Sequence, residues 1–181
     1  MNKQLRFLCH GAIIGALYAV LTLAAWSFSS MQIQVRISEA LSVLPIFTPA
    51  AIPGLFIGCL ISNLLGSGNV YDIVFGSLTT LLAAVLTRLI AKVVSGKLRL
   101  PLSLLPPVVL NALVVPFILY YGYGISSFLS YEGMLPVLCL NGVSVLCGQI
   151  ISCYLLGIPL YGLLAKITKR NNIFELDPKK K

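Results

Sequence analysis

The stretch QVRISEAL, residues 34–41, places Arg36 and Glu39 three positions apart in a chain of which 10% of the residues are charged and 58% are hydrophobic. Residues three apart lie on one face of a helix, so the guanidinium and the carboxylate can pair. An ion pair removed from water contributes little to stability, because desolvating both charges offsets their attraction. We therefore interpret Arg36 and Glu39 as residues that orient a ligand.

Two further carboxylates, Asp72 and Glu132, lie at or near the starts of other apolar segments. An acidic residue at a helix N-terminus gains about 0.3–1 kcal/mol from the helix dipole, so capping alone is an alternative explanation for Glu39, Asp72 and Glu132. Capping does not explain Arg36, because a cation at a helix start opposes the same dipole. The pattern predicts that these four side chains converge at one rim of a helical bundle.

Amide and aromatic side chains accompany these charges. Asn63, Asn111 and Asn141 lie within apolar segments, where polar groups face the bundle interior and bond either to a ligand or to a neighbouring helix. Tyrosines near the same rim either anchor the chain at the membrane interface or stack on a flat ligand. The candidate binding residues are Arg36, Glu39, Asn63, Tyr71, Asp72, Asn111, Tyr120, Tyr131, Glu132 and Asn141.

Long apolar segments must position these residues. About 20 apolar residues cross a bilayer core about 30 Å thick, and several runs in this chain reach that length. We predict an all-α integral membrane protein, with one six-helix domain at 1–170 and a basic tail at 171–181. One segment is too short to cross unless protein covers it, and the last is too long for one straight span. The predicted segments are about 8–28, 37–47, 49–66, 71–94, 102–123 and 134–167.

The net charge of +8 arises mainly from clusters that flank these segments. The clusters lie in the first six residues, at 88–99 and after residue 165, and Arg88 is the first basic residue of the middle one. Basic residues gather on the cytoplasmic side of membrane proteins, which predicts that both termini are cytoplasmic and that Arg36 lies outside. The same distribution argues against a nucleic-acid partner.

Small residues repeat along the first segment. Gly11, Gly15 and Ala19 share one helical face, whereas Ala12 and Ala16 share the neighbouring face. Small side chains at a spacing of four allow another helix to approach closely. This pattern fits packing inside the bundle and docking of an external partner equally well.

Sequence motifs for catalysis are absent. The phosphate-binding pattern G-x-x-x-x-G-K-[ST] does not occur, and no nucleophile–base pair or metal-ligand spacing is present. We therefore expect no enzymatic activity, no cofactor and no metal site in this chain.

Three stretches resemble a known family. They are QVRISEALSVLPIFTPAAIPGLFIGCLISNLLG at 34–66, YDIVFGSLTTLLAA at 71–84 and LLGIPLYGLLAKI at 155–167, and they are similar to the QueT family of substrate-binding (S) components of energy-coupling factor (ECF) transporters. The resemblance covers essentially the whole chain. It implies the six-helix S-component fold and a multi-pass location in the cell membrane.

The resemblance also implies a function. An S component captures a micronutrient and topples in the bilayer against a membrane scaffold (T) protein that carries two cytoplasmic ATPase subunits. The implied substrate is a queuosine precursor, a 7-deazaguanine such as the 7-aminomethyl base, the 7-cyano base or queuine. The A-x-x-x-A docking motif of the family maps onto Ala12 and Ala16.

The chemistry of such a ligand suits the candidate residues. A guanine-like edge offers adjacent N–H donors, which a carboxylate accepts well. Glu39 or Glu132 would accept from that edge, with Asp72 in reserve, and Arg36 would orient Glu39 or bond to the ring carbonyl. The alternatives are an S component for a different vitamin, a self-sufficient facilitator or channel, and a purely structural membrane subunit.

Overall fold

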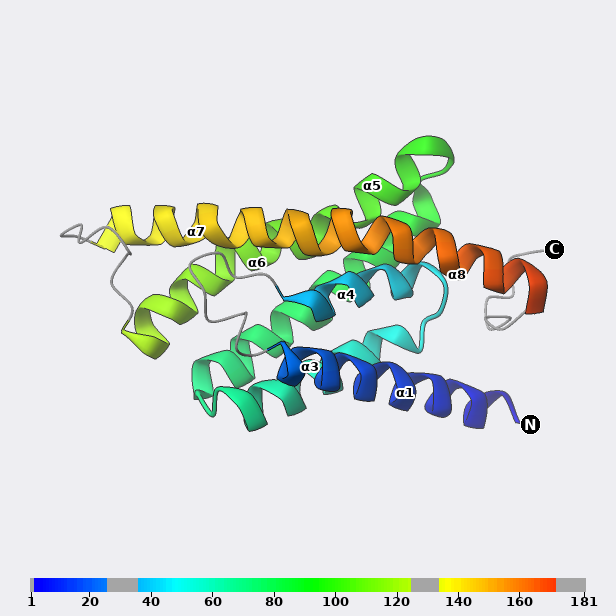
Figure 1. Cartoon of the computed structure of the whole chain (residues 1–181), viewed down its shortest axis with the longest axis horizontal. Helices are drawn as coiled ribbons and strands as arrows, with labels where there is room; N and C mark the ends of the chain where they lie inside the picture. Colours follow the sequence, from blue (N-terminus) through cyan, green and yellow to red (C-terminus); the bar gives the residue numbers. More distant parts are fainter. Residues whose placement is uncertain (1, 26–35, 125–133, 172–181) are drawn as a thin grey trace.

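The computed structural model describes residues 2–25, 36–124 and 134–171 of the chain. Every regular element in these ranges is a helix, which confirms the predicted all-α class (Figure 1). The predicted tail at 171–181 lies, apart from Asn171, outside the described residues. The elements are α1 (Lys3–Ala24), η1 (Ile37–Ile46), α3 (Ala51–Gly66), η2 (Asp72–Gly76), α4 (Ser77–Val93), η3 (Gly96–Leu98), α5 (Arg99–Ser103), α6 (Leu105–Phe117), η4 (Ile118–Gly122), α7 (Met134–Ile150), η5 (Ile151–Leu156) and α8 (Gly157–Asn171).

Within the described ranges these elements join into six helical segments. Four of them, at 3–24, 72–93, 96–122 and 134–170, are long and apolar enough to cross a membrane. The other two, η1 and α3, are shorter apolar helices. The predicted division into six segments is therefore confirmed, and the chain has the character of a multi-pass membrane protein.

The short segment η1 is a 3₁₀-helix, in which each residue adds about 2 Å of length. Its ten residues therefore extend only about 20 Å, and every residue from Ser38 to Ile46 is buried. Neighbouring helices cover this segment, as its length required. The burial matters for function because η1 carries Glu39 into the bundle interior.

Helices α1 and α3 pack with their backbones almost in contact. A Cβ atom added to Gly58 would lie 2.6 Å from the carbonyl oxygen of Gly15, and one added to Gly54 would lie 2.7 Å from that of Gly11. Only glycine permits such an approach. The glycine face of α1 thus packs inside the bundle, and it brings Tyr18 of α1 into the core.

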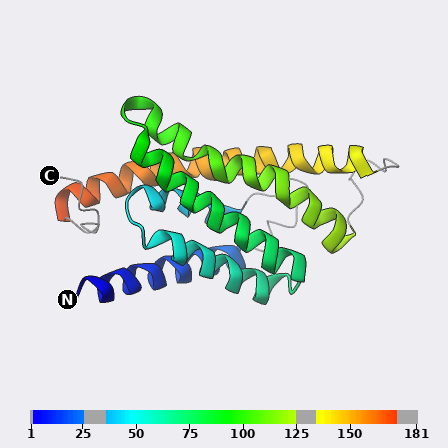
Figure 2. The same ribbon diagram turned by 180° about the vertical axis from the view of Figure 1, so that it is seen from behind.

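The two ends of the bundle differ in charge. The beginning of α1, the end of α8 and the turn at η3 lie at one end, whereas η4 and the beginning of α7 lie at the other (Figures 1 and 2). The basic residues of α1, α4, η3 and α8 therefore lie towards a common end. Figure 2 shows the same separation from behind.

Arg88 departs from this pattern. Its side chain is buried, and Nη1 donates a hydrogen bond to the carbonyl oxygen of Pro45 at 2.8 Å. Arg88, counted in the sequence with the basic cluster at 88–99, therefore faces η1 instead of the bundle surface. Contact with the last turn of η1 suits its charge, since a helix C-terminus carries partial negative charge.

Candidate binding site at the end of the bundle

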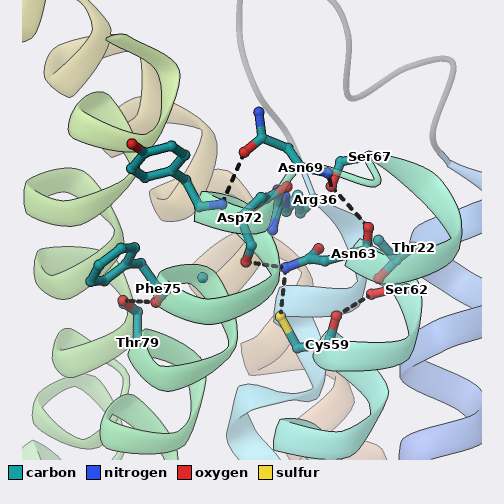
Figure 3. A network of polar contacts seen from close by, with 12 residues as sticks. Thr22, Arg36, Cys59, Ser62, Asn63, Ser67, Asn69, Asp72, Phe75 and Thr79 are labelled. Carbon is teal, nitrogen blue, oxygen red and sulfur yellow. Dashed lines mark hydrogen bonds and ion pairs between the residues drawn. The ribbon is translucent and has the colours of Figure 1, made fainter. Parts of the chain in front are cut away.

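Arg36 and Asp72 form an ion pair away from the basic end. Arg36 Nη2 lies 3.6 Å from Asp72 Oδ1, and the two side chains are 17% and 5% exposed (Figure 3). The predicted partner of Arg36 was Glu39, and that prediction was wrong. Arg36 precedes η1 with an extended backbone (φ −96°, ψ 103°), so the helical spacing of three does not apply to its side chain.

Asp72 is the point at which several segments meet. Tyr123, just after η4, donates its hydroxyl to Asp72 Oδ2 at 3.1 Å, and Asn63 Nδ2 of α3 donates to the Asp72 carbonyl oxygen at 2.9 Å. A Cβ atom on Gly76 would lie 2.9 Å from Asp72 Oδ1 and 3.0 Å from Asn63 Nδ2, so a larger residue here would displace these side chains. The Asp72 carboxylate pairs with Arg36 and accepts a hydrogen bond from Tyr123, both from other segments, and helix capping alone does not explain these contacts.

The electrostatics of this group fix its protonation at neutral pH. Burial lowers the pKa of Arg36, but attraction by Asp72, with a smaller contribution from Glu39, raises it more, so the pKa lies above its ordinary value. Partial burial raises the pKa of Tyr123; a hydrogen bond with Ser67 opposes this rise and the Asp72 charge adds to it. Arg36 is therefore a cation, and the Tyr123 hydroxyl keeps the proton that it donates to Asp72.

Glu39 occupies a deeper position and is only 2% exposed. Tyr18 of α1 donates its hydroxyl to Oε1 at 2.8 Å, and Ser42 donates to Oε2 at 3.1 Å. Both donors are neutral, and among the described residues no cation lies within ion-pair distance of this carboxylate. The position of Glu39 in the first turn of η1 is that of a capping residue, but its carboxylate oxygens accept hydrogen bonds from the side chains of Tyr18 and Ser42.

Asn63 is fully buried beside Asp72. Its Nδ2 also lies 3.5 Å from Cys59 Sγ, so the amide nitrogen has two partners in the described structure. Its Oδ1 is buried and has no partner there. Buried acceptors are rarely left unsatisfied, so Asn63 Oδ1 is free to receive a donor from a ligand or a water molecule.

Asn111 and Asn141 come from the neighbouring helices α6 and α7. Asn111 is buried and Asn141 is half-buried, and the Nδ2 atom of each has no partner among the described residues. These amide nitrogens do not bond the two helices together in the described structure, which weakens the alternative that they act as helix–helix contacts.

The predicted tyrosines Tyr71 and Tyr120 each contact a neighbouring aromatic ring. Tyr71 is 47% exposed and stacks on Phe75, with ring centroids 6.3 Å apart, and Tyr120 packs edge-on against Tyr121 at 5.1 Å. Neither tyrosine forms a hydrogen bond to Asp72 in the described structure. The remaining two predicted residues, Tyr131 and Glu132, lie outside the described residues.

Four residues of this region were missed by sequence reasoning. Tyr18 and Ser42 hold Glu39, Tyr123 holds Asp72, and Asn69 donates its side-chain amide to the Gly122 carbonyl oxygen. Tyr18 lies three residues after Gly15, so extending the glycine face by one turn would have found it. No pattern in the sequence singles out Tyr123 among the tyrosines near it.

The outer face of α1 carries the predicted docking residues. Ala12 and Ala16 are both exposed, whereas Gly15 on the adjacent face is buried against α3. The two faces of the small-residue ladder therefore have different surroundings. The glycine face packs within the bundle, and the alanine face remains available on its surface.

The chain was compared with known proteins. The model of a family described as QueT transporter matches residues 8–166, a range that includes every candidate residue named above. No curated protein and no solved structure matches the chain.

Proposed function

The chain belongs to the QueT transporter family, the S components of ECF transporters, and on this premise we propose that it captures a 7-deazaguanine precursor of queuosine. The proposed site surrounds Arg36 and Asp72 and extends to Glu39 and Asn63. The 7-aminomethyl base, the 7-cyano base and queuine all belong to this substrate class.

The observation that carries the proposal is the grouping of polar atoms around Asp72. The segment before η1, the end of α3, η2 and the residue after η4 all contribute to it. Polar groups removed from water are unfavourable unless they have hydrogen-bond partners, so a polar group inside an apolar bundle indicates a functional site. A flat polar ring supplies such partners along its edge.

Donors and acceptors in this group match a guanine-like edge. Asn63 Oδ1 and the Asp72 carboxylate accept hydrogen bonds and suit ring N–H groups, whereas Arg36 donates and suits a ring carbonyl. Asn111 Nδ2 and Asn141 Nδ2 would donate to remaining acceptors of the ring. Tyr71, Tyr120 or Tyr131 would stack on its face.

The charge distribution supports an orientation in the membrane. With the basic end in the cytoplasm, as basic residues prefer, the Arg36 and Asp72 group faces the outside and both termini are cytoplasmic. Substrate is then bound from outside. Delivery would require toppling against a scaffold protein that carries two ATPase subunits, and the exposed pair Ala12 and Ala16 would form the contact with that scaffold.

Calorimetric titration of the purified full-length chain with the 7-aminomethyl and 7-cyano bases tests the substrate class. Saturable binding of either base supports the proposal, whereas binding of an unrelated vitamin with neither base bound would refute the substrate. Any ultraviolet-absorbing ligand that co-purifies with the chain would identify that vitamin.

Reconstitution in vesicles tests the mode of transport. Vesicles that contain the chain alone should bind substrate without accumulating it, and accumulation should require the scaffold protein, the ATPase subunits and ATP. Uptake by the chain alone would instead identify a facilitator.

A further inference from the structure

Glu39 gives the candidate site a second carboxylate beside Asp72, for the single guanidinium of Arg36. Asp72 lies 3.6 Å from Arg36, whereas the carboxylate of Glu39 accepts hydrogen bonds from the neutral hydroxyls of Tyr18 and Ser42 and is attracted to Arg36 only from beyond ion-pair distance. The remaining buried cation, Arg88, bonds to the Pro45 carbonyl oxygen, which lies six residues after Glu39 and about 12 Å further along the 3₁₀-helix.

The sequence between the described ranges does not supply a cation either. Residues 26–35 and 125–133 contain no Lys, Arg or His, and the second of them contains a further acid, Glu132. These two stretches therefore add one acid and no basic side chain to the sequence. A buried carboxylate without a cation in contact is unfavourable, so this arrangement calls for a cation that neither stretch provides.

A second observation is an unsatisfied acceptor in the neighbouring group. Asn63 is fully buried, and its Nδ2 is fixed by bonds to the Asp72 carbonyl oxygen and to Cys59 Sγ (Figure 3). This fixes the orientation of the amide, and it leaves Oδ1 without a donor in the described structure. The acceptor is independent of Glu39 and lacks a donor, which an N–H group on a ring edge can supply.

We propose that the chain selects 7-deazaguanines that carry a positive charge, with Glu39 as the counter-charge of the ligand. The 7-aminomethyl base carries an ammonium at neutral pH, as the amine of queuine does, whereas the 7-cyano base is neutral. This inference rests on the proposed function and adds a preference within its substrate class.

The geometry of Glu39 suits an ammonium. A carboxylate accepts about four hydrogen bonds, and Tyr18 and Ser42 use two of them, one on each oxygen. An ammonium has three donors and can occupy the remaining positions. Because Glu39 is 2% exposed, such a contact would be shielded from water and weakly screened by salt.

Titration of both bases into the wild type and the Glu39→Gln variant tests the proposal. The wild type should bind the 7-aminomethyl base more tightly than the 7-cyano base. Glu39→Gln should weaken binding of the aminomethyl base about 10- to 100-fold, the value of one charge-assisted hydrogen bond, and leave binding of the cyano base nearly unchanged. Glu39→Asp keeps the charge, and it should retain the preference even where the affinity falls.

The outcomes separate this inference from the proposed function. A wild type that binds the cyano base as tightly as the aminomethyl base would overturn the preference while leaving the function intact. An equal loss for both bases in Glu39→Gln would assign Glu39 a structural role and overturn the inference as well. Should neither base nor queuine bind to the wild type, the proposed function fails and the inference falls with it.

Discussion

Replacing Gly58 with alanine tests the packing of α1 against α3. The added Cβ atom would lie 2.6 Å from the Gly15 carbonyl oxygen and 2.9 Å from Tyr18 Cβ, both shorter than the 3.4 Å at which ordinary contacts begin. The obstacle at 2.6 Å is backbone, so no change of rotamer relieves it and the two helices must separate by several tenths of an ångström. Overpacking of this kind costs about 1–3 kcal/mol, and we expect the upper part of that range.

The matched control is Gly162→Ala in α8. A Cβ atom at this position meets no atom within 4 Å, so the substitution adds a methyl group to open space. Alanine favours a helix over glycine by about 0.5–1 kcal/mol, so this variant should equal or exceed the wild type in stability. Both variants make the same chemical change, and only the packing around the added methyl group differs.

The free energy of unfolding of the purified proteins, measured by denaturant titration in detergent micelles, decides the outcome. Gly58→Ala should be destabilised by about 2–3 kcal/mol relative to the wild type. It should also bind substrate more weakly, because displacing Tyr18 disturbs the hydroxyl that donates to Glu39. A Gly58→Ala protein as stable as the wild type would refute the close contact between α1 and α3.

Three further substitutions test other parts of the molecule. Asp72→Asn removes the negative charge that pairs with Arg36, and we expect the substrate affinity measured by calorimetry to fall about 10- to 100-fold. Unchanged affinity would exclude Asp72 from the site. Ala16→Leu enlarges an exposed side chain, so folding and substrate binding should persist while co-purification with the scaffold protein is lost. Undiminished co-purification would contradict docking at this face. Arg88→Met should lower the free energy of unfolding by about 1–3 kcal/mol, because the Pro45 carbonyl oxygen loses its donor; a variant more stable than the wild type would argue against anchoring of η1.

Much of the fold was predictable because the bilayer constrains it. Apolar length predicts where helices cross, and the six predicted segments correspond one to one with the described helices. The first helix begins at Lys3 instead of residue 8, and the fifth begins at Gly96 instead of residue 102. The short segment at 37–47 was expected to be covered by protein, and η1 is covered. Its 3₁₀ geometry was not predicted, since hydrophobic spacing over ten residues does not distinguish helix types.

The composition of the site was less predictable than its location. Sequence reasoning selected Arg36, Asp72 and Asn63, and the structure brings them together. It paired Arg36 with Glu39 because of their spacing, but the extended backbone at Arg36 sends that side chain to Asp72, 36 positions away. Periodicity describes neighbours on one helix, whereas this contact depends on how separate helices are placed.

The small residues of α1, Gly11, Ala12, Gly15, Ala16 and Ala19, carry more information in their types than in their spacing. Spacing alone left internal packing and external docking equally supported. The residue types separate them, because a Cβ atom at Gly15 would lie 2.9 Å from the Gly54 carbonyl oxygen, a distance that alanine cannot accept. Ala12 and Ala16 already carry a Cβ atom, so the closest backbone contact must lie on the glycine face. The alanine pair, which is exposed, is then the part of the ladder left for a partner.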